Sequence, residues 1–295
     1  MAIEYVQTPL LDLAYEAQGP SDGTPVLLLH GFPDDVRAWD DVARALAAAG
    51  YRTIAPYLRG FGPTRFRDAQ TIRSGQNAAL AQDGIELADA LGLDKFALVG
   101  HDWGAQAAQA IAALHPERVQ HLVSFAPYSL TWSDYQEGPP NYSQLRALWY
   151  QQVLQGELGE QLLQWDRQGF CRYLWETWSP SHRWSEAAFA ATAGSFENPD
   201  FVAVVLQAYR SGYDQTVNDE QYATIEARLA ERPSISVPTT VLLGRDDGVA
   251  LFEPSMLEQQ RDFTGDYVAR VYDQVGHFIH RERPEVVIDA VLNTR

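Results

Sequence analysis

The sequence predicts an α/β fold, with a mostly parallel central sheet flanked by helices and interrupted by an inserted helical domain. Short continuous apolar runs alternate with helical segments over the first 125 residues. Such runs are typical of strands buried on both faces of a parallel sheet. Strand-like runs stop near residue 128 and resume near residue 239, and the segment between them is helical in pattern and rich in aromatic residues. We therefore expect a core domain of residues 1–128 and 215–295 and a helical cap of residues 129–214.

The predicted core elements alternate along the chain. Residues 3–15 alternate loosely between apolar and polar and indicate edge strands. Buried strands are expected at 25–29, 52–56, 96–99, 119–125, 239–243 and 268–272, and helices at 38–49, 76–92 and 105–114. Gly50 follows the first helix, where a glycine commonly ends a helix.

Composition excludes several classes of partner. The chain has 295 residues, 46% of them hydrophobic, which is ample for a large core. Its net charge of −17 disfavours nucleic acid and anionic membranes, and it has no apolar run long enough to span a bilayer. The first residues lack the basic and apolar pattern of a signal peptide, and Cys171 is the only cysteine. We expect a cytoplasmic protein, monomer or homodimer, that binds neither nucleic acid nor membrane.

The segment Gly100-His101-Asp102-Trp103-Gly104 lies between a predicted buried strand and an alanine-rich helix. A strand that turns at once into a helix makes a sharp bend, and glycines at the bend let the backbone segments approach closely. The residue at the tip, Asp102, is then pushed out of the fold and into a cleft. The alternative is an exposed Asp that caps the N-terminus of the helix.

Two further polar residues follow predicted strands. Asp247 follows the strand 239–243, and His277 follows the last strand. Loops at the carboxyl ends of parallel strands lie at the edge of the sheet where ligands bind in open α/β folds. The order of nucleophile, acid and histidine along the chain predicts a catalytic triad. Asp246 is the alternative acid, although a spacing of three residues after Gly244 favours Asp247.

Four segments carry a resemblance to the α/β-hydrolase superfamily, and within it to the epoxide hydrolase and haloalkane dehalogenase branch. They are His30-Gly31-Phe32-Pro33, Arg59-Gly60-Phe61-Gly62, Gly100-His101-Asp102-Trp103-Gly104, and Gly276-His277-Phe278 with Glu282-Arg283-Pro284-Glu285 after it. The resemblance implies that Asp102 is the nucleophile and that His277, oriented by Asp247, is the general base. It also implies an oxyanion hole built from the backbone N–H groups of Phe32 and Trp103, with Phe32–Pro33 in the cis form.

Several features separate the branches of this family. Haloalkane dehalogenases more often have Asn or another halide-holding residue where Phe32 stands. Trp103 and Gln106 offer no positive charge for the carboxylate of a haloacetate. Tyr150 and Tyr209 lie in segments similar to the two cap-tyrosine motifs of epoxide hydrolases, although simple packing in an aromatic-rich cap is an equal alternative. The residues expected to line the substrate pocket are His30, Pro33, Trp149 and Phe278.

We therefore expect a hydrolase without cofactor or metal that converts a small apolar epoxide and water into a vicinal diol. An Asp carboxylate, with a reference pKa of ~3.9, is ionised at neutral pH and can attack a saturated carbon to form an alkyl ester on Asp102. Tyrosine hydroxyls can then protonate the departing oxygen, and His277 can activate the water that cleaves the ester. The alternative is a haloalkane or haloacid dehalogenase with the same triad. An esterase-like enzyme or a non-catalytic small-molecule binding protein is a weaker alternative, because binding alone needs no histidine base.

Overall fold

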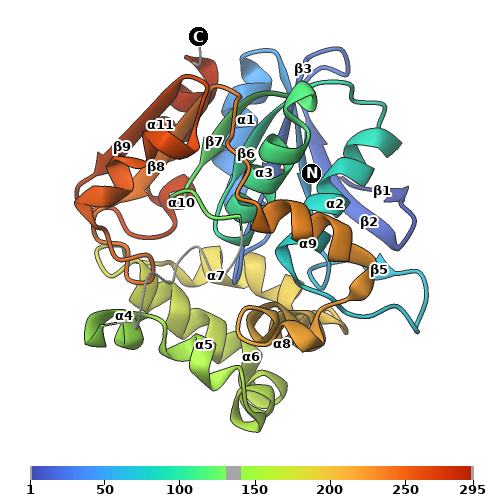
Figure 1. The fold of residues 1–295 in the computed structure, drawn as a ribbon, viewed down its shortest axis with the longest axis vertical. Helices are drawn as coiled ribbons and strands as arrows, with labels where there is room; N and C mark the ends of the chain where they lie inside the picture. Colours follow the sequence, from blue (N-terminus) through green and yellow to red (C-terminus); the bar gives the residue numbers. More distant parts are fainter. Residues whose placement is uncertain (1, 131–140, 294–295) are drawn as a thin grey trace.

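The central element is one sheet, which has nine strands in the described part of the chain and is drawn from the computed structural model in Figure 1. The structure describes residues 2–130 and 141–293. The strands are β1 (Ile3–Gln7), β2 (Leu11–Gln18), β3 (Thr24–Leu29), β4 (Tyr51–Pro56), β5 (Arg65–Phe66), β6 (Phe96–Gly100), β7 (Val119–Ser124), β8 (Thr239–Gly244) and β9 (Tyr267–Tyr272). Their order is β1-β2-β4-β3-β6-β7-β8-β9, with β5 beside β2. The pairs from β4 to β9 are parallel, which confirms the predicted fold class.

The register of the parallel strands brings the motif-bearing loops to one edge of the sheet. Leu29 at the end of β3 lies opposite Gly100 at the end of β6. Gly244 at the end of β8 lies opposite Tyr272 at the end of β9. Because the chain leaves parallel strands in the same direction, the segments that follow these four residues emerge at the carboxyl edge of the sheet.

Helices cover both faces of the sheet. They are α1 (Asp40–Ala48), α2 (Asn77–Ala90), α3 (Trp103–Leu114), α9 (Ala223–Ala230), α10 (Ile279–Glu282) and α11 (Pro284–Leu292). Side chains of a strand point alternately to its two faces, and β3 shows the result. Leu27 and Leu29 pack in the apolar core that contains α2 and α3, whereas Val26 and Leu28 pack in the core that contains α1 and α11. Burial on both faces explains why this strand is a continuous apolar run.

Between β7 and β8 the described residues form helices and no strand. Besides α9, the α-helices of this stretch are α4 (Tyr142–Ala147), α5 (Trp149–Val153), α6 (Glu157–Trp178), α7 (Glu186–Ala193) and α8 (Phe201–Ser211). In Figure 1 they form a separate layer below the sheet. The predicted cap includes residues 131–140, which lie outside the described residues. No helix in the described ranges is both long and apolar enough to cross a membrane.

A buried ion pair holds the loop after β4 against α2. The guanidinium of Arg59 donates two hydrogen bonds of 2.7 Å to the carboxylate of Asp83, and both side chains are almost fully buried. Arg59 also donates to the carbonyl of Ser74 and to the hydroxyl of Tyr222. The loop that contains Arg59-Gly60-Phe61-Gly62, one of the four segments that carry the resemblance, is therefore anchored by a buried ion pair.

Replacing Asp83 with Asn should lower the free energy of unfolding by about 3–5 kcal/mol, because the guanidinium of Arg59 is left buried without its counter-charge. Urea unfolding followed by circular dichroism measures this. Asp41→Asn is the matched control, since the pair of Asp41 with Arg44 is exposed and contributes at most about 1 kcal/mol. Equal losses for the two variants would contradict the role assigned to the buried pair.

Candidate active site

The bend between β6 and α3 forces Asp102 into an unusual backbone conformation. Its φ of 52° and ψ of −119° lie in a region that residues with a Cβ rarely adopt, and such strain concentrates at functional sites. A Cβ on Gly104 would overlap the carbonyl oxygen of Leu29, so the helix can follow the strand this closely only with glycine at that position. The predicted sharp bend is present, and it presents the Asp102 carboxylate at the carboxyl edge of the sheet.

The three predicted triad residues lie together. Nε2 of His277 is 3.6 Å from Oδ2 of Asp102, and Nδ1 of His277 is 2.9 Å from Oδ2 of Asp247. The other oxygen of Asp247 accepts the backbone N–H groups of Val249 and Ala250, which fixes the carboxylate. Asp246, the alternative acid, accepts a hydrogen bond from Ser181, whereas the carboxylate at the imidazole is that of Asp247.

His277 is held in its charged form by its neighbours. Burial favours the neutral imidazole, but the negative charges of Asp247 and Asp102 outweigh burial and raise the pKa of His277 to about 10. The resting site therefore contains an imidazolium between two carboxylates at neutral pH.

The predicted oxyanion-hole residues flank the Asp102 carboxylate. The backbone N–H of Phe32 donates to Oδ1 of Asp102 at 2.9 Å, and the Phe32–Pro33 peptide bond is cis. Trp103 is the first residue of α3, and the first N–H groups of a helix have no partner within the helix. The N–H of Phe32 thus lies on an oxygen that would become negative if the carboxyl carbon were attacked, and the N–H of Trp103 stays the predicted second donor.

Aromatic rings from the helical layer between β7 and β8 pack against the two residues that flank the Asp102 carboxylate in space, Phe32 and Trp103. The ring of Tyr209 contacts Phe32 and Trp103, with centroids 5.5 and 5.6 Å apart. Tyr150 contacts Tyr209 at 5.3 Å and Trp178 at 5.0 Å. The two tyrosines come from different cap helices, α5 and α8, and the fold brings them into contact with each other and with the bend.

Both phenols are held in their neutral form. Burial raises the pKa of Tyr150 and of Tyr209 well above 10, and the negative charge of Asp102 raises both further. At neutral pH each hydroxyl therefore keeps its proton and can act as a hydrogen-bond donor.

The four predicted pocket residues have different surroundings. Nε2 of His30 accepts the backbone N–H of Leu58 and Nδ1 donates to the carbonyl of Gly31, so neither nitrogen is free for a ligand. The carbonyl of Pro33 accepts the indole N–H of Trp175. The remaining two have aromatic partners: Trp149 packs on Tyr150, Phe170 and Tyr173, and Phe278 packs against Trp175, Trp178 and Trp184.

Sequence reasoning missed Trp178, the last residue of α6. Its ring is buried, and the ring centroid lies 5.0 Å from that of His277 and 5.0 Å from that of Tyr150. Trp178 therefore lies between a triad residue and one of the two tyrosines. The chain has eight tryptophans, and no local pattern distinguishes this one from those that only pack.

One group of described side chains has the composition of a metal site. Asp34, His101 and His280 are buried close together. The Asp34 carboxylate, however, already forms an ion pair with the guanidinium of Arg281 through both oxygens. A cation beside a bound guanidinium would be repelled, so the arrangement fits a structural ion pair and not a metal centre.

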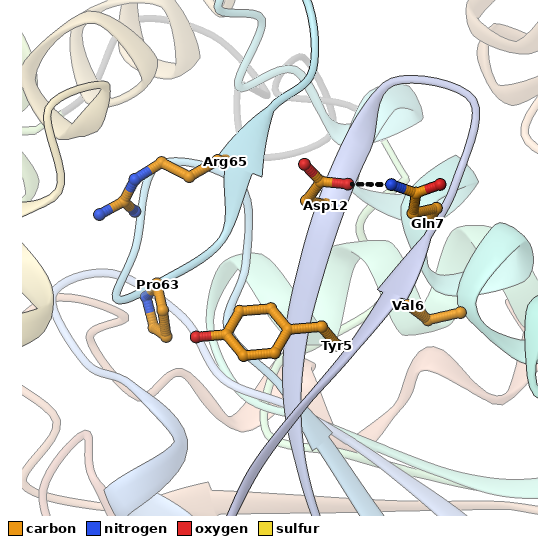
Figure 2. Close-up of a pocket in the computed structure, with 6 residues that line it drawn as sticks. All are labelled: Tyr5, Val6, Gln7, Asp12, Pro63 and Arg65. Carbon is orange, nitrogen blue, oxygen red and sulfur yellow. Dashed lines mark hydrogen bonds between the residues drawn. The ribbon is translucent and has the colours of Figure 1, made fainter.

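The pocket in Figure 2 lies at the outer edge of the sheet, away from the triad. It has a volume of about 390 Å³ and is lined by Tyr5, Val6, Gln7, Asp12, Pro63 and Arg65. Asp12 accepts a hydrogen bond from Gln7 across the hairpin of β1 and β2. The side chains that line it include no arrangement of nucleophile and base, so it does not compete with the triad as the candidate site.

The profile of the α/β hydrolase fold family matches residues 24–284. A solved structure of a candidate epoxide hydrolase from Klebsiella pneumoniae superposes with a TM-score of 0.94 at 38% identity, covering 99% of this chain and 96% of that one. An epoxide hydrolase from Caballeronia sordidicola is 29% identical over 286 residues, which cover 88% of this chain and 84% of that protein. Epoxide hydrolase 2 from Siraitia grosvenorii is 43% identical over 109 residues, 37% of this chain, and the match spans 34% of that protein's length. These findings confirm the expected resemblance.

His277 should titrate far above its ordinary value of 6.5, with a midpoint near 10 in the folded protein. Nitrogen-15 NMR of the imidazole measures this midpoint. Because the folded pKa is the higher one, the pairing stabilises the fold fully below about pH 6.5, and this stabilisation is lost as the pH rises through about 10.

Two variants test whether the neighbouring carboxylates raise the pKa of His277. Asp102→Asn should lower the midpoint because it removes one of the two neighbouring charges. Asp246→Asn should leave it unchanged, since Asp246 pairs with Ser181 and not with the imidazole. A wild-type midpoint near 6.5 would show that the charges do not act on His277 as described.

Proposed function

Because the chain belongs to the α/β hydrolase fold family and is an epoxide hydrolase-like hydrolase, we propose that it converts a small apolar epoxide and water into a vicinal diol through an ester on Asp102. The observation that carries the proposal is the pair of neutral, buried phenols of Tyr150 and Tyr209 beside a carboxylate that is backed by His277. The enclosing rings favour an uncharged, apolar substrate. We assign residues 129–214 to a cap domain that supplies both phenols.

In the first step, Oδ2 of Asp102 attacks one ring carbon of the epoxide. The new carbon–oxygen bond forms the ester while the bond between the attacked carbon and the epoxide oxygen breaks, and the oxygen stays attached to the other carbon of the ring. The departing oxygen is a strongly basic alkoxide, so it takes a proton from Tyr150 or Tyr209. The imidazolium of His277 then restores the phenol through water, which leaves a neutral imidazole.

The loss of charge on Asp102 makes His277 available as a base. An ester carries no negative charge, so one of the two groups that raise the pKa of His277 is removed on alkylation. The neutral imidazole, oriented by Asp247, can take a proton from water, and the hydroxide attacks the ester carbon. The developing oxyanion is stabilised by the N–H of Phe32, with that of Trp103 as the second donor.

Collapse of this intermediate closes the cycle. The acyl–oxygen bond breaks, and the departing alkoxide takes the proton of the carboxylic acid that forms on Asp102. His277 keeps the proton that it took from water. The diol leaves, and the site returns to a carboxylate beside an imidazolium.

His277→Gln should stop the reaction after one ester forms at each site, because ester cleavage requires the imidazole as a base, whereas water can restore the phenol without it. With styrene oxide as the first member of a panel of epoxides, the variant should consume about one equivalent of substrate per site and then stop. Mass spectrometry of the intact protein should find the mass of the epoxide added, and peptide mapping should place it on Asp102. Asp102→Ala is the control and should form no adduct. Continued turnover by Asp102→Ala would remove Asp102 as the nucleophile.

Replacing Tyr150 and Tyr209 together with Phe keeps the rings but removes the proton donors. Single-turnover alkylation of Asp102 by an epoxide should slow by about 10²–10⁴-fold, the usual size of general-acid catalysis. Tyr173→Phe, which changes an exposed tyrosine of the cap, is the matched control.

The same double variant distinguishes the alternative dehalogenase activity. A halide leaves as a weak base and needs no strong acid, so release of bromide from bromobutane would fall only slightly. If epoxides alkylate the double variant at the wild-type rate, the two phenols are no reason to prefer epoxides to haloalkanes as the substrate class.

A further inference from the structure

The C-terminal end of cap helix α6 rests on the two loops that carry Asp247 and His277. The carbonyl of Trp178 accepts the backbone N–H of His277 at 3.1 Å and that of Gly248 at 3.0 Å. The last carbonyls of a helix have no partner within it, so this one is free to accept both bonds. One atom of the cap thus joins the acid loop and the histidine loop.

Two glycines allow this close approach. A Cβ on Gly276 would lie 2.5 Å from the Cα of Ser179, and a Cβ on Gly248 would overlap the carbonyl oxygen of Thr177. Both distances are shorter than a side chain tolerates, so the end of α6 and the triad loops are in contact along the backbone itself.

Ser179, the residue after α6, extends the contact. Its side chain is fully buried, donates to Oε1 of Glu282 and accepts the backbone N–H of Phe278 at 3.2 Å. The second oxygen of Glu282 accepts the N–H of Gly276 at 2.9 Å. Glu282, Trp178 and Ser179 therefore bind the N–H groups of three consecutive residues, 276 to 278, with His277 in the middle.

We propose that Ser179 and Glu282 are positioning residues that hold His277 where it activates water for ester cleavage. The inference rests on the proposed function. Before alkylation the charges of Asp102 and Asp247 both hold the imidazole, but the ester on Asp102 removes one of these attractions. From then on the backbone of the histidine loop must keep the ring aligned. The step that depends on Ser179 and Glu282 is therefore hydrolysis of the ester and not its formation.

The test separates the two chemical steps in Ser179→Ala and Glu282→Gln, with styrene oxide as the probe. Single-turnover alkylation of Asp102 should stay within about twofold of wild type. Hydrolysis of the ester should slow by about 10- to 100-fold, the effect expected when a catalytic group is misplaced by a fraction of an ångström to one ångström. Mass spectrometry should then find the ester accumulating during steady-state turnover.

Ser181→Ala is the matched control, because Ser181 lies in the same segment but binds Asp246. It should keep both rates. Circular dichroism identifies the temperature range in which each variant is folded, and Glu282→Gln, which preserves side-chain shape, provides the measurement if Ser179→Ala is unstable.

The outcomes distinguish this inference from the proposed function. Suppose that the wild-type protein turns over an epoxide through the ester. If the two variants then slow both steps equally, or leave ester hydrolysis unchanged, the positioning role is overturned and the proposed function stands. A wild-type protein that forms no ester with any epoxide of the panel would overturn the proposed function, and the positioning role with it.

Discussion

The charges at and around the bend between β6 and α3, which are largely shielded from water, are the constraint on which the rest of the site depends. A carboxylate removed from water is costly unless a positive charge and hydrogen bonds replace the solvent. Asp102 has the N–H of Phe32 on one oxygen and the imidazolium of His277 near the other. His277 is in turn held by Asp247. Three loops at this edge of the sheet therefore carry groups that stabilise one another and the Asp102 carboxylate: the loop after β3 with Phe32, the loop after β8 with Asp247, and the loop after β9 with His277.

The histidine loop is anchored from both sides. On one side, the end of α6 and Glu282 bind its backbone N–H groups. On the other, Arg281, in the helix that follows His277, forms a buried ion pair with Asp34 from the loop after β3 and donates to the hydroxyl of Thr192 in α7. Core and cap are thus connected through charged and polar contacts that surround the triad, in addition to the apolar contacts of the rings.

A second carboxylate strengthens the connection between core and cap. Asp35 is buried and accepts the hydroxyls of Ser195 and Thr192 at 2.6 and 3.1 Å. Burial, together with the negative charge of Asp34, raises the pKa of Asp35 to about 7. Thr192 lies in α7 and Ser195 in the stretch that joins α7 to α8, the helix that carries Tyr209. The polar contacts of Asp35 therefore help to fix the segment that leads to one of the two phenols.

The sequence by itself determined the fold class, the places of the buried strands along the chain and the positions of Asp102, Asp247 and His277 after the ends of strands. It did so because burial on both faces requires continuous apolar runs and because a tight strand-to-helix bend requires glycines, and both are local properties. Tertiary structure showed which of the two acids contacts the imidazole, where the spacing in the sequence had only favoured Asp247. It alone brought Tyr150 and Tyr209 into contact with each other, and it alone showed that Trp178, Ser179 and Glu282 hold the histidine loop. These contacts join residues far apart in the chain, and they depend on how the cap helices lie on the sheet, which no local pattern of residues records.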